Sequence, residues 1–166
     1  MVLIRAERPE DVRAVRDLIT VAFKEAEHRS GTEASIVDAL RAAGALSLSL
    51  VAVGDEEVVG QVAFSPVTID SGLSGWFGLG PVAVRPDRQR SGIGKALIEV
   101  GLTRLRDNGA GGCVVLGDPR YYARFGFVSD PALRYAEVPV PYFQRIVFGG
   151  PPPTGEVAYH EAFDAV

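Results

Sequence analysis

The chain has 166 residues and a formal net charge of −4, and 47% of its residues are hydrophobic. This length fits one domain over residues 1–166, and the apolar content excludes a disordered chain. No long basic run suggests nucleic-acid binding, and no apolar stretch is long enough to span a membrane. A single cysteine, Cys113, excludes an internal disulfide framework. Because the apolar run at the N-terminus is too short for a signal peptide, we expect a cytoplasmic protein.

The first part of the chain is predicted to form one strand and two helices. Residues 2–6 read as a short strand, and Pro9 occupies the first position of a helix whose apolar residues recur at helical spacing. Ser30-Gly31-Thr32-Glu33 fits a capping box, in which two side chains satisfy free N–H groups at a helix start. We therefore expect a second helix that begins there and ends near Gly44.

Three strands are predicted next. Residues 46–53 and 58–69 are separated by a polar turn and predict a hairpin, in which Pro66 should interrupt the ladder or lie where no hydrogen bond is needed. Residues 76–84 form the next predicted strand. Gly80-Pro81 lies in its middle, and since proline has no N–H and glycine weakens pairing, this dipeptide suits a break in the ladder.

A glycine-bearing turn follows this strand and leads into a predicted helix over residues 92–108. The turn reads Gln89-Arg90-Ser91-Gly92-Ile93-Gly94-Lys95 and is preceded by Arg85 and Arg88. A helix start has backbone N–H groups without intrahelical partners, and glycines let an anion approach them closely. The pattern predicts a pyrophosphate cradle. Its spacing excludes a Walker loop, because position 89 is Gln, and a dinucleotide fingerprint, because the third glycine is missing.

The last third of the chain is predicted as strands joined by less regular segments. Residues 112–117 read as a strand and 119–125 as a short helix that carries Tyr121 and Tyr122, and Phe127-Val128 begins another strand. The prolines in 129–148 predict irregular structure over the site, 149–155 a stiff loop, and the alternation in 156–163 a last strand.

Two motifs of this region belong together. Gln89-Arg90-Ser91-Gly92-Ile93-Gly94 follows a strand, and Tyr121-Tyr122-Ala123-Arg124-Phe125-Gly126-Phe127 comes after the next helix and strand. In this order they resemble the acyl-CoA loop and the Tyr-x-x-x-Gly-Phe element of the GNAT acyltransferase superfamily. The resemblance covers residues 2–127, with its core motifs in 76–127, and assigns 129–166 to the same domain on one late strand. It implies an α/β fold of the α+β type, with a mixed central sheet splayed between strands 4 and 5 and flanked by about four helices.

The resemblance also implies the cofactor and the residues that bind it. Acetyl-CoA would be the co-substrate, and no metal is expected. Backbone groups of Val82, Ala83 and Val84 would pair with the pantetheine amides. The pyrophosphate would be held by the loop, namely Gln89, Arg90, Ser91, Gly92, Ile93, Gly94 and Lys95. Whether Arg85, Arg88 or Arg90 reaches further phosphates is left open.

The same resemblance indicates a proton donor but no base. Tyr122 matches the superfamily tyrosine and would act as general acid, since a phenol is protonated at neutral pH; Tyr121 is the alternative donor. The strand over 76–84 contains no acid, which departs from many superfamily members. The candidates for the base are Glu25, Glu27, His28, Asp118 and water, although Asp118 also suits a helix cap. Cys113 is expected to be a buried small hydrophobe that carries no acyl group, and His160 to be structural.

The function implied by these motifs is that of an N-acetyltransferase. It would move an acetyl group from acetyl-CoA to a primary amine by direct attack in a ternary complex. The acceptor is either a small-molecule amine or a protein amino group, bound by the first two helices, their connector and residues 129–148. The alternative is a non-catalytic acyl-CoA-binding sensor or partner module. The sequence does not reveal the oligomeric state, and a homodimer is left open.

Overall fold

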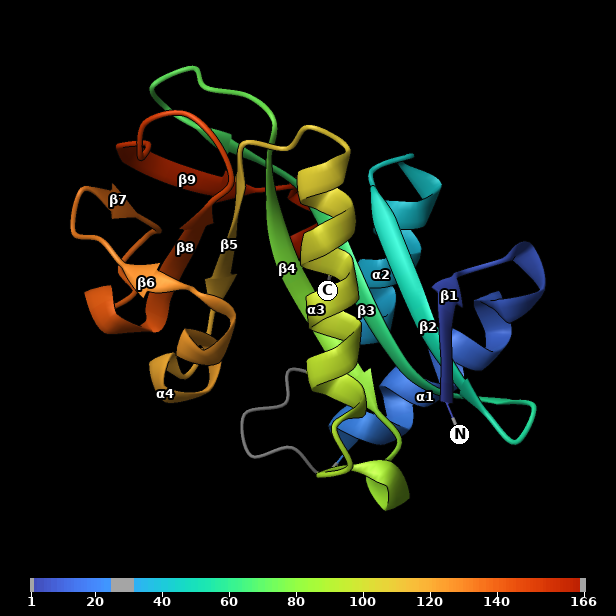
Figure 1. Ribbon diagram of the computed structural model, residues 1–166. Helices are drawn as coiled ribbons and strands as arrows, with labels where there is room; N and C mark the ends of the chain where they lie inside the picture. The colour runs from blue at the N-terminus through green and yellow to red at the C-terminus, as the bar shows by residue number, and fades with distance from the viewer. Residues whose placement is uncertain (1, 25–31, 165–166) are drawn as a thin grey trace. The chain divides into compact units, whose positions relative to one another are not determined.

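The computed structural model in Figure 1 describes residues 2–24 and 32–164. The chain divides into two compact units. The first consists of Met1–Phe64, Gly80–Gly101 and Glu161–Val166, and the second of Ser65–Leu79 and Leu102–His160. The long elements β3, β4 and α3 each run from one unit into the other. That residues 1–166 form a single domain stays a prediction.

The first unit contains an antiparallel set of strands in the order β1–β2–β3. These are β1 (Val2–Ala6), β2 (Leu48–Gly54) and β3 (Glu57–Ile69). The strand over 2–6 and the hairpin are thus confirmed, with β2 shifted slightly toward the turn. Pro66 lies between the end of the β2 ladder at Phe64 and the start of the β9 ladder at Val67, as a residue without an N–H requires.

Two helices cover one face of these strands. A 3-10 turn at Pro9–Asp11 leads into α1 (Val12–Lys24), and Thr32 precedes α2 (Glu33–Ala42). The predicted capping box begins at Ser30 and Gly31, which lie outside the described residues. The apolar side chains of both helices pack with alternate residues of the strands, and this core comprises Val15, Leu18, Ile19, Val37, Val51, Ala63 and Ala83.

The helix α3 (Ile93–Asp107) packs on the opposite face of β3. Neighbouring side chains on a strand point to opposite faces, so Ala63 faces α1 while Phe64 faces α3. A Cβ built at Gly101 would lie 2.3 Å from Cε1 of Phe64, and one at Gly60 would lie 2.8 Å from Cγ2 of Ile93. The two glycines therefore let the first turns of α3 lie close to β3, which positions the start of the helix.

The second unit is organised around the parallel pair of β4 (Trp76–Val84) and β5 (Gly112–Leu116). Both strands agree with the sequence prediction, and the first and last residues of β4 are the predicted ones. The pair comprises three registered positions and ends at Gly78 and Val114. After Leu79 come Gly80, with φ of +138°, and Pro81, so the ladder stops just before the glycine-proline pair, as predicted.

The prediction of irregular structure over 129–148 is wrong for its last part, where residues 143–147 form a strand. Within it β8 (Phe143–Val147) pairs antiparallel with all five residues of β5 and also with β6 (Val128–Ser129). The strand escapes recognition because it is five residues long, follows two prolines and carries Gln144 and Arg145 between its apolar residues. The order β4–β5–β8–β6 therefore combines a parallel with antiparallel pairs, which confirms the mixed sheet.

The remaining elements of the second unit are short. They are α4 (Pro119–Tyr122) with a 3-10 turn at Ala123–Phe125, β7 (Leu133–Arg134) and β9 (Gly155–Tyr159). The short helix over 119–125 is confirmed, whereas the last strand ends at Tyr159 instead of 163. β9 pairs with β3 and β7 and closes a second core around Trp76, which also contains Val67, Ile69, Val114, Leu133, Phe143 and Val157. In the described parts of the chain, no helix is both long and apolar enough to cross a membrane.

Candidate functional site

The loop after β4 has the backbone geometry of an anion site. α3 begins at Ile93, and the first N–H that bonds back into the turn is that of Ala96, which donates to the carbonyl of Gly92 over 3.0 Å. The N–H groups of Ile93, Gly94 and Lys95 have no partner among the described residues. Such groups, at the positive end of the helix dipole, favour a bound anion.

The approach to these N–H groups is open. Gly92 has φ of +87°, and a Cβ built there would meet no atom within 4 Å. Arg90 has φ of +65°, a left-handed conformation that is costly for a residue with a Cβ. The turn is shaped by the hydrogen bond from the Gln89 side chain to the Val84 carbonyl, at 3.2 Å, and by the one from the Ser91 hydroxyl to the Arg88 carbonyl.

Two of the four cations around the loop are already paired. The Arg85 guanidinium lies 2.7 Å from a carboxylate oxygen of Glu57 and 2.6 Å from one of Asp87, and Arg88 lies 2.8 Å from Asp55. Arg90 and Lys95 are exposed and have no ion pair within the described ranges 2–24 and 32–164. Arg90 and Lys95 are therefore the cations available to a phosphate, whereas Arg85 and Arg88 fix the loop to the β2–β3 turn.

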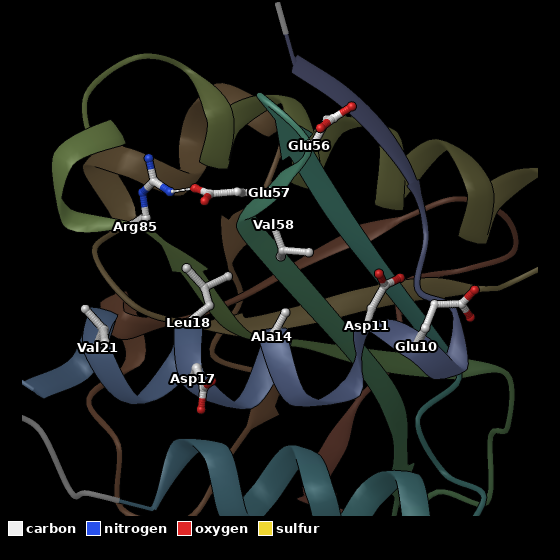
Figure 2. Close-up of a pocket in the computed structure, with 10 residues that line it drawn as sticks. All are labelled: Glu10, Asp11, Ala14, Asp17, Leu18, Val21, Glu56, Glu57, Val58 and Arg85. Atoms are coloured by element: carbon white, nitrogen blue, oxygen red, sulfur yellow. Dashed lines mark hydrogen bonds and ion pairs between the residues drawn. The ribbon is translucent and has the colours of Figure 1, made fainter.

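A groove of about 590 Å³ lies on the other side of Arg85, along α1 and the β2–β3 turn (Figure 2). Its carboxylates outnumber its single guanidinium, which is bonded to Glu57. The acidic lining residues are Glu10, Asp11, Asp17, Glu56 and Glu57. Such a lining repels a diphosphate, so the groove is not a place for the phosphates of a cofactor.

In the first unit, the last residues of β4 can offer a ligand their backbone groups rather than their side chains. Ala83 is only 2% exposed, because its methyl group belongs to the core beneath α1. Val82 and Val84 are half-buried. The peptide groups of Val82, Ala83 and Val84 therefore lie between the loop and Pro81, which has no N–H.

Tyr122 occupies the last position of α4 in the second unit. Asp118 caps this helix by accepting a hydrogen bond from the Arg120 N–H over 2.9 Å. The Tyr122 ring lies against Gly117, where a Cβ would come within 2.5 Å of the ring atom Cε2. The rings of Tyr121 and Phe127 stand edge-on to it, with centroids at 5.0 and 5.9 Å. The orientation of this ring is therefore fixed from several sides.

The Tyr122 hydroxyl is protonated and has no hydrogen-bond partner among the described residues. Burial of the ring raises the pKa of Tyr122 to about 12, because it disfavours the phenolate. Tyr121, the alternative donor, packs under the Arg124 guanidinium, which lies 4.3 Å from its ring centroid. Both tyrosines are half-buried, and the ring of Tyr122 is the one that packs against Gly117 and Phe127.

Comparison with known proteins gives these features a family. The model of the acetyltransferase (GNAT) domain matches residues 46–129. The uncharacterized N-acetyltransferase YhbS of Escherichia coli (strain K12) is 40% identical over 126 residues, which are 75% of this chain and 72% of the relative. The chain belongs to the GNAT acetyltransferase family.

Solved GNAT structures resemble the whole chain. A GNAT family acetyltransferase from Brucella melitensis, solved in complex with acetyl-CoA, shares 50% identity over 99% of both chains, with a TM-score of 0.89. YhbS from Escherichia coli, solved in complex with CoA, shares 36% identity over 98% of this chain and 92% of its own, also with a TM-score of 0.89. These likenesses confirm the predicted fold class.

Not every residue predicted from the GNAT resemblance suits its role. The pKa of the Asp118 carboxyl is lowered, first by the Arg120 side chain that pairs with it, so Asp118 is a helix cap and a weak base. Cys113 is fully buried, and this burial raises its pKa far above the usual thiol range, as befits a small buried hydrophobe. Glu25, Glu27 and His28 lie outside the described residues.

The other predictions concern His160 and metals. His160 directly follows the last residue of β9. No group of three or more His, Cys, Asp or Glu side chains that could hold a metal occurs in the part of the chain that the structure describes.

Among the buried polar residues of this GNAT domain, one lies beside Gly117 in the same unit as Tyr122 and was not predicted from the sequence. Gln144 of β8 is 1% exposed, and its side-chain amide donates a hydrogen bond to the Gly117 carbonyl over 3.0 Å. No sequence signal marks it, because the strand that carries it was itself missed.

Proposed function

We propose that this protein transfers the acetyl group of acetyl-CoA to a primary amine by direct attack of the amine on the thioester. The observation that carries the proposal is the start of α3, where three N–H groups without partners among the described residues, the open Gly92 and the cations Arg90 and Lys95 form an anion site. Membership of the GNAT family and the acetyl-CoA and CoA complexes of its relatives support the same ligand.

The cofactor would be held mainly by backbone. The pyrophosphate accepts hydrogen bonds from the N–H groups between Arg90 and Lys95, and the two side-chain cations neutralise its charge. The peptide groups of Val82, Ala83 and Val84 pair with the pantetheine amides. Holding both reactants in one geometry supplies on the order of 7 kcal/mol of the barrier in favourable cases.

The reaction needs one proton removed and one supplied. The neutral amine attacks the thioester carbon, a C–N bond forms, the C–S bond breaks, and the nitrogen loses a proton while the sulfur gains one. Tyr122 is the proposed donor to the sulfur. With a pKa of about 12 it is a weaker acid than a thiol in water, at about 8.5, so its hydroxyl first donates a hydrogen bond to the developing thiolate. Burial that raises the thiolate pKa then favours the transfer.

Several candidates exist for the base and for the acceptor. β4 contains no acid, and Asp118 is held in its ionised form by Arg120, so Glu25, Glu27, His28 or a water molecule would accept the amine proton. The acceptor is a small-molecule amine or a protein amino group. The missing acid in β4 is also the one feature that favours a non-catalytic acyl-CoA-binding module.

Release of CoA thiol from acetyl-CoA over a panel of primary amines tests this function. We expect turnover with at least one amine, and a Tyr122→Phe variant with a kcat lower by about 10²-fold or more and an unchanged KM for acetyl-CoA, since a positioned acid contributes about 10²–10⁴-fold. Tyr121→Phe is the matched control and should retain most of the activity.

Three outcomes would count against the proposal. Binding of CoA without turnover for any amine favours the binding module. Full activity of Tyr122→Phe rejects the tyrosine as acid. A larger loss in Tyr121→Phe than in Tyr122→Phe reassigns that role to the neighbouring ring.

A further inference from the structure

We propose that Gln144 is a positioning residue for Tyr122, acting through the carbonyl of Gly117. The proposal rests on the function given above, in which Tyr122 donates to the leaving sulfur. It concerns residues of the second unit only, and it starts from a side chain that is almost completely buried yet forms a single hydrogen bond among the described residues.

The Gln144 amide is oriented by its single bond. Its Nε2 donates to the Gly117 carbonyl over 3.0 Å, whereas its Oε1 is buried without a partner among the described residues. A buried acceptor without a hydrogen bond is costly, and an apolar residue at this position would avoid that cost. The bond to Gly117 is thus the feature that distinguishes a glutamine from a leucine here.

Both backbone polar groups of Gly117, its N–H and its carbonyl, form hydrogen bonds. Its N–H donates to the Tyr142 carbonyl over 2.9 Å, while its carbonyl accepts from Gln144. Gln144 itself is fixed, because β8 pairs with Val115 of β5 on one side and with Ser129 of β6 on the other. The peptide at the end of β5 is therefore clamped by the segment that leads into β8 and by β8 itself.

The clamped residue is the one on which the proposed acid rests. The Tyr122 ring lies so close to Gly117 that a Cβ there would be 2.5 Å from Cε2. The Tyr122 N–H also donates to the carbonyl of Asp118, the next residue along the chain, over 3.1 Å. A displacement of the Gly117 peptide would thus move both the surface under the ring and the start of the helix that carries it.

The first experiment compares substitutions of two buried glutamines. Gln61 of β3 is the matched control: it is fully buried, its Nε2 donates to the Ser49 hydroxyl over 3.0 Å, and its Oε1 likewise has no partner among the described residues. We expect Gln144→Leu to lower kcat about tenfold with an unchanged KM for acetyl-CoA. Gln61→Leu should leave kcat within about twofold at a similar change in melting temperature. Equal kcat values in the two variants would overturn the proposal.

A double-mutant cycle separates this proposal from the function on which it rests. If Gln144 acts through Tyr122, Gln144→Leu slows the wild type but changes kcat little in a Tyr122→Phe background. A tenfold loss in both backgrounds would show that Gln144 does not act through Tyr122 and would overturn the inference alone. Full activity of Tyr122→Phe would instead refute the acid assignment.

A conservative variant provides a test that does not depend on tolerance of leucine. In Gln144→Glu, burial raises the pKa of the new carboxyl, which can donate to Gly117 only while it is protonated. We expect the ratio of variant to wild-type kcat to approach one at low pH and to fall as pH rises through that pKa. A ratio that does not change with pH would contradict a role for the donated hydrogen bond.

Discussion

At the scale of single residues, the proposed chemistry depends on the environment of one phenol. Tyr122 is surrounded by rings and by a glycine, and the loss of water around it explains why its pKa is raised to about 12. Asp118 and Cys113 lie in the same unit but are unsuited to acid–base or acyl-carrier roles, the first because Arg120 stabilises its charge and the second because it is buried. Local environment, more than residue type, selects the functional group.

Gly117 should tolerate no side chain. In Gly117→Ala the new methyl would lie 2.5 Å from Cε2 and 3.2 Å from Cδ2 of Tyr122, so the ring must move. We expect a loss of about 1–3 kcal/mol in the free energy of unfolding and a lower kcat. Gly149→Ala is the control, because a Cβ there meets nothing within 4 Å. Chemical denaturation and steady-state kinetics measure both effects, and wild-type kinetics in Gly117→Ala would refute the importance of this contact.

The raised pKa of Tyr122 also makes a prediction about pH. Because its folded pKa of about 12 exceeds the unfolded value of about 10, the stability gained by burying the neutral phenol is complete below pH 10 and is lost as pH rises toward 12. Ionisation of Tyr122 should therefore cause no fall of kcat below pH 10. The difference in phenolate absorbance between wild type and Tyr122→Phe checks this, and a midpoint near pH 10 in the folded protein would contradict it.

At the scale of elements, the position of α3 relative to β3 is set by glycines, and the loop before it is held by ion pairs. Gly60 and Gly101 allow the helix to approach β3, and Arg85 and Arg88 tie the loop to the β2–β3 turn. These pairs are exposed, so each contributes little to stability, but they leave Arg90 and Lys95 as the two cations of the loop without an ion pair among the described residues. Neighbouring carboxylates therefore divide the four cations into two that are paired and two that have no ion pair among the described residues.

Removal of these two cations should weaken acetyl-CoA binding. We expect a double variant, Arg90→Ala with Lys95→Ala, to raise the KM for acetyl-CoA about tenfold or more at low ionic strength, with less effect at high salt because surface charges are screened. Arg106→Ala, in the last turn of the same helix, is the matched control and should leave KM unchanged. Steady-state kinetics at two salt concentrations measure the KM for acetyl-CoA in both variants. Equal KM values in the double variant and in Arg106→Ala would refute the assignment of Arg90 and Lys95 to acetyl-CoA binding.

Sequence patterns predicted most elements but not all of them. β4 was found with its observed bounds because an apolar run, a Gly-Pro break and a glycine turn mark it together. β8 was missed, since five residues with two polar side chains carry no clear periodicity, and its pairing with β5 depends on contacts far apart in the sequence. Gln144 was lost for the same reason. The separate roles of Arg85 and Arg90 were equally invisible, because they depend on carboxylates contributed by the β2–β3 turn.

At the scale of the whole molecule, the proposed anion site lies in a chain with a net charge of −4. The acidic groove along α1 and the loop before α3 both belong to the first unit, and the contrast of charge between them excludes a diphosphate from the groove while favouring it at the loop (Figure 2). The proposed ligand site therefore depends on the local charge at the start of the helix and not on the overall charge.

The most direct test of this account is a calorimetric titration of the protein with CoA. We expect saturable 1:1 binding that weakens as salt increases and is strongly reduced in the variant that lacks the cations at positions 90 and 95. An absence of binding heat at millimolar CoA, together with no shift of the melting temperature, would contradict the anion site at the start of α3 and with it the proposed acetyl transfer.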